Sequence, residues 1–157
     1  MELQKVFDFI RAMNDEGVDY ITFGAIALNL HGIVRAATDA DFFIRPDGRN
    51  IERLKSALRR VWNDPQIAEI NADDMLGDYP SIMYGPPDET FNLDFLARVS
   101  DVHSGDELVS QVIEYEGIPI RVVTAETLYE MKMNSARPMD QVDAERLRVK
   151  YPALGEQ

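Results

Sequence analysis

One glycine near the N-terminus constrains the fold of this chain more than any other residue. Gly24 separates a short β-rich run, residues 20–23, from a helix-forming run, residues 26–30. The chain must therefore turn from strand to helix at Gly24-Ala25. The first N–H groups of such a helix lack intrahelical partners and attract an anion, and glycine lets the backbone approach it closely. The turn predicts a phosphate-binding corner, although small residues at such turns more often serve packing alone.

A second β-rich run covers residues 40–44; it carries Asp41, and Asp39 directly precedes it. Residues two apart on a strand point to the same face, so these carboxylates can converge. At a separation of ~4 Å they would repel by about 4 kcal/mol at an effective dielectric constant of about 20. Mg²⁺ removes this repulsion, because it prefers oxygen ligands and is usually held by one or two carboxylates plus substrate phosphates. The alternative for an isolated pair of this kind is a solvated strand edge.

Asp94 is a third candidate acid, because it interrupts the largely apolar run of residues 91–96. An acid in such a run is rarely buried without a partner. If this run forms a strand beside the one that carries Asp39 and Asp41, three carboxylates meet near the phosphate-binding corner. That combination is typical of metal-assisted phosphoryl or nucleotidyl transfer. Asp94 has two alternatives, which are to cap a loop or to pair with Arg98.

Polar side chains that suit a phosphate lie before the acid pair and near the C-terminus. Arg35 and Thr38 precede the acids and are placed to reach a triphosphate. Lys132, with a compact ammonium, and Arg137, with a guanidinium that binds through two N–H groups, also suit phosphate binding.

The C-terminal cations have a structural alternative. Arg137 precedes Asp140 and Asp143 in a helical region. An ion pair between Arg137 and either acid would only fasten the last two helices together. The sequence leaves both interpretations open, and for Lys132 the structural one is weaker.

The remaining patterns predict an α+β fold. Apolar residues at helical spacing mark one helix near the N-terminus and another that ends near residue 61, and residues 63–79 favour one or two short helices with loops. Further strands are expected at residues 81–84, 91–96, 111–115 and 118–123. Thr124 caps a helix that runs to about residue 134, and Pro138 opens the final helix. This order predicts a mostly antiparallel or mixed β-sheet flanked by helices, with a helical C-terminus.

The length of 157 residues suits one domain that buries about 70% of the surface of the unfolded chain. We expect residues 1–157 to form that domain, with a core over about 20–123 and C-terminal helices over about 124–150.

Composition excludes several classes of function. The chain has no cysteine, which rules out disulfides, thiolate metal sites and a cysteine nucleophile. A net charge of −12 argues against an extended nucleic-acid surface, because such binding depends on Lys and Arg. The N-terminus lacks a secretory pattern, and no apolar run approaches the ~18 residues of a membrane span. We therefore expect a cytoplasmic protein without membrane contact.

Two segments resemble a known family. The Gly24 turn, the Asp39/Asp41 pair and Asp94 on a later strand resemble the signature of the DNA polymerase β-like nucleotidyltransferase superfamily. Within it, residues 23–41 and 127–143 are similar to the AbiEii/AbiGii toxin-type and related uncharacterised nucleotidyltransferases. Members of this group act as toxins of toxin–antitoxin pairs and transfer nucleotides to tRNA or proteins. The resemblance thus implies a nucleoside triphosphate such as ATP as substrate, an acceptor that the sequence does not identify, and a cognate antitoxin as partner.

The resemblance also implies roles for individual residues. Asp39 and Asp41 would bind the catalytic Mg²⁺ or Mn²⁺ ions, and Asp94 would assist the second ion and help to activate the nucleophile. The nucleotide-binding residues would be Gly24, Ala25, Arg35, Thr38 and Lys132.

Ala25 departs from the family pattern, which has Gly or Ser at this position. If position 25 needs a positive φ, alanine strains the turn by about 1 kcal/mol or more. If it already belongs to the helix, little is lost. Together with the acidic charge, this departure supports an alternative function, a catalytically inactive module of the same fold for nucleotide sensing or protein binding.

Overall fold

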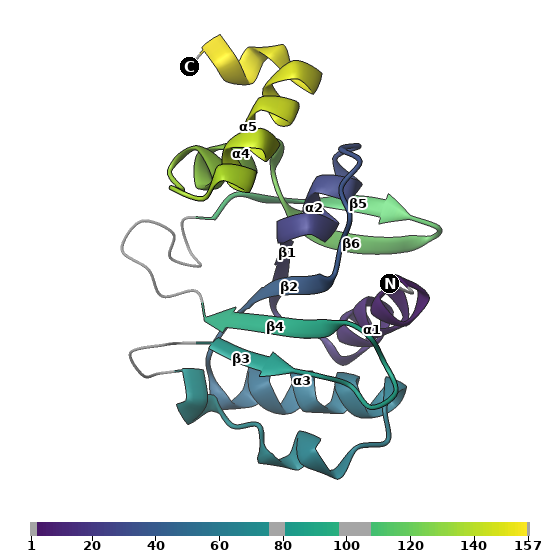
Figure 1. Cartoon of the computed structure of the whole chain (residues 1–157). Coiled ribbons are helices and arrows are strands. Elements are labelled where there is room, and N and C mark those ends of the chain that lie inside the picture. The colour runs from purple at the N-terminus through teal and green to yellow at the C-terminus, as the bar shows by residue number, and fades with distance from the viewer. Residues whose placement is uncertain (1–2, 76–80, 98–107, 157) are drawn as a thin grey trace.

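The computed structural model describes residues 3–75, 81–97 and 108–156 (Figure 1). In chain order the elements are α1 (Leu3–Glu16), β1 (Tyr20–Phe23), α2 (Gly24–Leu30), β2 (Asp39–Ile44), α3 (Gly48–Val61), the 3₁₀ helices η1 (Pro65–Glu69) and η2 (Ala72–Met75), β3 (Ser81–Tyr84), β4 (Asn92–Ala97), β5 (Ser110–Tyr115), β6 (Ile118–Val123), α4 (Ala125–Met133), α5 (Pro138–Lys150) and the 3₁₀ helix η3 (Pro152–Glu156).

The strands of the described residues form one six-stranded sheet in the order β3-β4-β2-β1-β6-β5. β2 runs parallel to β4, and β1 runs parallel to β6. The neighbours β1–β2, β3–β4 and β5–β6 are antiparallel. A mixed sheet with helices at both ends of the chain confirms the α+β fold class.

The two faces of the sheet pack against different helices. On one face, Phe42 and Phe95 belong to a buried cluster with apolar residues of α1 and α3, here called the α1/α3 core. On the other face, Phe43 belongs to a second cluster with apolar residues of α4 and α5, here called the α4/α5 core. Side chains alternate along a strand, so Asp39 and Asp41 of β2 lie on the same face as Phe43. The acids therefore share the face on which the C-terminal helices pack.

Local capping explains where the later helices begin. The Thr124 hydroxyl accepts a hydrogen bond from the backbone N–H of Thr127 at 3.2 Å, which confirms the predicted N-cap of α4. Pro138 stands in the first turn of α5, as the sequence predicts. The Asp47 carboxylate caps α3 by accepting from the N–H of Asn50 at 2.8 Å. These contacts satisfy N–H groups that a helix leaves unpaired.

Two details differ from the sequence prediction or lie beyond the described residues. α2 begins at Gly24, two positions earlier than the apolar pattern indicates, because Gly24 and Ala25 add no large side chain to that pattern. The short helices expected within residues 63–79 are η1 and η2, and residues 76–80 lie outside the described residues. None of the helices in the described ranges is long and apolar enough to cross a membrane.

Candidate active site

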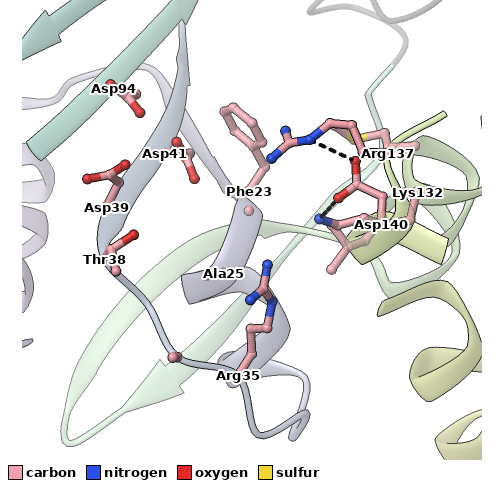
Figure 2. A pocket seen from close by; sticks show the side chains of 14 residues that line it. Phe23, Ala25, Arg35, Thr38, Asp39, Asp41, Asp94, Lys132, Arg137 and Asp140 are labelled. Atoms are coloured by element: carbon pink, nitrogen blue, oxygen red, sulfur yellow. Dashed lines mark hydrogen bonds and ion pairs between the residues drawn. The ribbon is translucent and has the colours of Figure 1, made fainter. Parts of the chain in front are cut away.

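Aspartates from two neighbouring strands meet on one face of the sheet. In the parallel pair β2–β4, Asp41 lies opposite Asp94, and Asp39 lies opposite Asn92. The Asp41 carboxyl donates a hydrogen bond to Asp94, and Asp39 accepts one from the backbone N–H of Asn92 at 3.3 Å. Figure 2 shows the three carboxyl groups together on these strands. The structure thus brings together the acids that the sequence singled out.

Burial and mutual repulsion perturb these carboxyl groups. Burial is the main reason why the pKa of Asp41 rises to about 7, and the hydrogen bond and charge of Asp94 and the charge of Asp39 add to it. The positive charge of Lys132 opposes this rise. Burial also raises the pKa of Asp94; the hydrogen bond from Asp41 opposes this shift, and the charge of Asp39 adds to it. Carboxylates that share a site have raised pKa values because their like charges repel each other. A bound cation would take the place of the shared proton.

The donor set suits a hard divalent ion such as Mg²⁺ or Mn²⁺, because all the candidate ligands are carboxylate oxygens. Within the ranges that the structure describes, no group of three or more His, Asp or Glu side chains is arranged as a metal site. Mg²⁺ is commonly held by one or two protein carboxylates and by substrate phosphates instead of a complete protein cage. The contacting pair Asp41 and Asp94, with Asp39 beside it, therefore fits an ion that is bound together with a nucleotide.

Gly24 brings the backbone against this acidic group. Its φ is +71°, in the left-handed region that favours glycine. A Cβ at this position would collide with the Asp41 carboxylate. Ala25 is not among the described non-glycine residues with positive φ, which are Asp88 and Glu116, and it lies inside α2. Alanine at position 25 therefore adds no backbone strain, and the requirement for glycine lies at position 24.

Two cations from distant parts of the chain share one carboxylate. The Lys132 Nζ on α4 lies 2.8 Å from Asp140 Oδ1 and 3.2 Å from Asp143 Oδ2. Arg35, in the connection from α2 to β2, places Nε 3.2 Å from Asp143 Oδ1. Burial would raise the pKa of Asp140, but the hydrogen bonds from Lys132 and Ser135 and the nearby positive charges lower it below its usual value. These ion pairs connect α4 and α5 to the segment before β2.

Arg137 plays little part in fastening the helices. Its side chain is 82% exposed, and its Nε lies 3.9 Å from Asp140 Oδ2 within the first turn of α5. The ion pairs that join α4 to α5 come from Lys132, which donates to Asp140 and lies close to Asp143. Lys132, and not Arg137, thus provides most of the ion pairing that joins the last two helices. Arg137 lines the pocket and remains available to a ligand.

A pocket of about 550 Å³ separates the acids from the cations. In Figure 2, the aspartates of β2 and β4 lie on one side and Arg35, Lys132 and Arg137 on the other, with Phe23 between them. The pocket is lined by Phe23, Gly24, Ala25, Arg35, Ala36, Thr38, Asp39, Asp41, Asp94, Leu128, Met131, Lys132, Arg137 and Asp140. All the residues expected from the sequence to form the site line this pocket, and their roles in catalysis and binding remain predictions.

The sequence did not single out Leu128 and Met131, which also line the pocket. A signal for them exists, because Leu128, Met131 and Lys132 have the i, i+3, i+4 spacing of one helix face. Phe23 begins the segment 23–41 that resembles the family, but no role in the site was predicted for it.

Several histidine and aromatic side chains that could bind a nucleotide do not line this pocket. His31 is buried, and its Nε2 lies 2.7 Å from the carbonyl oxygen of Val123, so it joins α2 to the end of β6. The aromatic side chains of Trp62 and Tyr84 are buried in the α1/α3 core. Arg98, the alternative partner proposed for Asp94, lies outside the described residues.

No family model matches this chain, and no curated protein is detectably similar to it. Its fold is nevertheless similar to those of solved structures. ANT(2″)-Ia, solved in complex with adenylyl-2″-tobramycin, is 13% identical with a TM-score of 0.55, over 93% of this chain and 87% of that chain. An antigenic nucleotidyltransferase-like protein from Paracoccidioides brasiliensis is 15% identical with a TM-score of 0.58, over 91% and 74% of the two chains.

JHP933 from Helicobacter pylori is 18% identical with a TM-score of 0.55, over 98% of this chain and 70% of that chain. At these identities the likeness concerns the fold and not the substrates. The chain therefore has the α+β fold of the nucleotidyltransferases.

Proposed function

We propose that this protein is a metal-dependent nucleotidyltransferase that moves a nucleoside monophosphate from a nucleoside triphosphate to an acceptor hydroxyl. The observation that carries the proposal is the division of one pocket into an acidic side, with Asp41 and Asp94, and a basic side, with Lys132 and Arg35. A metal–triphosphate complex needs both sides, because its ion requires oxygen ligands and its phosphates require cationic donors.

In the proposed reaction, a bond forms between the acceptor oxygen and the α-phosphorus. The bond from that phosphorus to the α–β bridging oxygen breaks, and pyrophosphate leaves. Asp39, Asp41 and Asp94 would hold Mg²⁺ or Mn²⁺, which when bound neutralises charge on the attacking and leaving oxygens. The Asp94 carboxylate accepts the proton of the acceptor hydroxyl. Lys132 and Arg35 bind the polyphosphate, together with the Thr38 hydroxyl and the N–H groups that follow Gly24.

Binding of the nucleotide is the first test of this proposal. In titration calorimetry, we expect wild-type protein to bind the non-hydrolysable analogue α,β-methylene-ATP in the presence of Mg²⁺. The double variant Asp39→Asn/Asp41→Asn should lose this binding, because it removes carboxylate ligands at nearly constant shape. A matched control, Glu69→Gln/Asp73→Asn, removes the same formal charge at two exposed positions and should bind as wild type does. Equal affinity in all three proteins would exclude the assigned metal ligands.

Transfer is the second test, and it separates the enzyme from the inactive module. Incubation with α-labelled nucleoside triphosphates, Mg²⁺ and a cell extract should yield a labelled acceptor that Asp41→Asn does not produce. RNA, proteins and small molecules are all to be examined as acceptors. A small molecule is included because one structural neighbour was solved in complex with adenylyl-2″-tobramycin. Nucleotide binding without any labelled acceptor would favour the alternative, a sensing or protein-binding module.

We further propose that the protein is the toxin of a toxin–antitoxin pair, on the resemblance of residues 23–41 and 127–143 to toxin-type nucleotidyltransferases. Expression of the wild-type chain alone in a bacterial host should then arrest growth. Asp41→Asn should abolish the arrest, and co-expression of the neighbouring reading frame should relieve it. Normal growth with active, well-expressed wild-type protein would rule out this role while leaving the nucleotidyl transfer open.

A further inference from the structure

Asp143 of α5 lies behind the basic side of the pocket. Its side chain is completely buried, whereas the side chains of Lys132 and Arg35 are 15% and 26% exposed. Both cations line the pocket, and Asp143 does not. Seen from the pocket, the carboxylate is therefore covered by its two partners.

The contacts of Asp143 leave the donors of both cations available. It lies 3.2 Å from Lys132 Nζ and 3.2 Å from Arg35 Nε, but neither contact is aligned as a hydrogen bond within the described part of the chain. Lys132 has three N–H donors and gives one to Asp140, while Arg35 has five. A buried carboxylate is costly unless cations compensate it, so this pairing holds both cations strongly without using up their donors.

We propose that Asp143 is a positioning residue that brings Arg35 and Lys132 to one place as a joint receptor for the polyphosphate of the nucleotide. The inference rests on the proposed function, whose substrate is a nucleoside triphosphate. Arg35 belongs to the connection before β2 and Lys132 to α4, so the shared carboxylate is their common link. Without it, two like charges from separate elements would repel one another.

The direction in which Asp143→Asn changes the affinity for anions tests this inference. Asp143→Asn removes a negative charge from beneath an anion-binding site, so Coulomb attraction alone predicts tighter binding of anions. Positioning predicts the opposite, a loss of about tenfold or more in affinity for inorganic triphosphate and for α,β-methylene-ATP with Mg²⁺. Glu145→Gln is the matched control, because it removes the same charge from an exposed position on the same helix. It should leave both affinities at the wild-type value.

A double-mutant cycle excludes a merely structural role. If Asp143 acts through Arg35, Asp143→Asn should weaken triphosphate binding much less in an Arg35→Gln background than in wild type. If Asp143 only supports packing, Asp143→Asn lowers stability, but the folded protein binds triphosphate with unchanged affinity, which overturns the proposal. Should Asp143→Asn fail to fold, the proposal is tested by the losses of triphosphate affinity in Arg35→Gln, in Lys132→Gln and in the variant that combines them. Non-additive losses support a joint receptor, and additive losses overturn it.

The two probes separate this inference from the proposed function. Wild-type protein that binds inorganic triphosphate through Asp143 but not the Mg²⁺–nucleotide complex would refute the function and keep the positioning role. Nucleotide binding that is equally strong in Asp143→Asn would refute the positioning role and keep the function. A wild-type protein that binds neither probe refutes both.

Discussion

Gly24 meets two separate requirements, and substitutions can distinguish them. Its φ of +71° costs an L-residue about 1–2 kcal/mol, and a Cβ would also collide with the Asp41 carboxylate. We expect Gly24→Ala to lower the free energy of unfolding by at least about 1–2 kcal/mol. It should also abolish binding of α,β-methylene-ATP with Mg²⁺, because Asp41 must move. Urea unfolding and calorimetry measure the two effects.

Gly17 provides the control for this prediction. Its φ is +72°, but a Cβ there would meet nothing within 4 Å. Gly17→Ala should therefore lose about 1 kcal/mol of stability through backbone strain alone and keep the wild-type affinity for the nucleotide. If Gly17→Ala and Gly24→Ala lost nucleotide binding equally, the contact between Gly24 and Asp41 would not be the cause.

The pKa of Asp41 makes stability depend on pH in an unusual direction for a carboxyl group. Its ordinary value is 3.8 and its value in the folded protein is about 7. Between these values the native state keeps a proton that the unfolded chain has released. The contribution of Asp41 to the free energy of unfolding therefore falls as pH rises from about 4 to about 7, and it is lost above that range.

Thermal unfolding without divalent ions should show this decline, and Asp41→Asn should make it much flatter. Mg²⁺ binds the deprotonated carboxylate, so its stabilising effect should grow as pH rises through about 7. A variant with the same pH dependence as wild type would assign the decline to other groups.

Between elements, Asn50 joins the start of β1, the end of β2 and the first turn of α3. Its side chain is buried, accepts a hydrogen bond from the N–H of Asp19 at 2.7 Å, and donates to the carbonyls of Asp19 and Arg45 at 3.0 Å each. Asn50→Ala removes these bonds and should lower the free energy of unfolding by about 2–3 kcal/mol. The exposed Asn63 is the control, and Asn63→Ala should change stability by less than about 0.5 kcal/mol in the same urea titration.

The elements themselves were predictable because their signals are local. β1 runs from Tyr20 to Phe23 as expected, and Thr124 caps α4 as expected, since alternation and capping are readable within a few residues. The order of the strands could not be predicted from local signals, because it depends on contacts between distant segments. The sequence could state that Asp94 would join the acids only if β4 lay beside β2, and the parallel pairing of these strands supplies that condition.

In the candidate site, too, some features were predictable from local sequence and others depended on contacts between distant segments. Spacing alone indicated that Asp39 and Asp41 share a face, because period two is a property of any strand. The partner of Arg35 was not predictable, since Asp143 reaches it only when α5 packs on the second face of the sheet. The role of Ala25 was also open until the backbone showed that the positive φ belongs to Gly24.

On the scale of the whole molecule, the sheet separates two cores with different relations to the pocket. The α1/α3 core lies on the face opposite the acids, whereas the α4/α5 core lies on their face and carries the helices with Lys132 and Asp143. Stability and nucleotide affinity should therefore respond differently to cavities made in the two cores.

Leu147 and Leu54 allow a matched comparison, because both are completely buried and each belongs to one core. Either change to alanine should lower the free energy of unfolding by about 2–5 kcal/mol in urea titrations. Leu147→Ala also loosens α5, so the remaining folded protein should bind α,β-methylene-ATP with Mg²⁺ more weakly, and Leu54→Ala should keep the wild-type affinity. Equal losses of affinity in both variants would mean that the positions of the cations depend on the stability of the whole fold and not on the packing of α5 against the sheet.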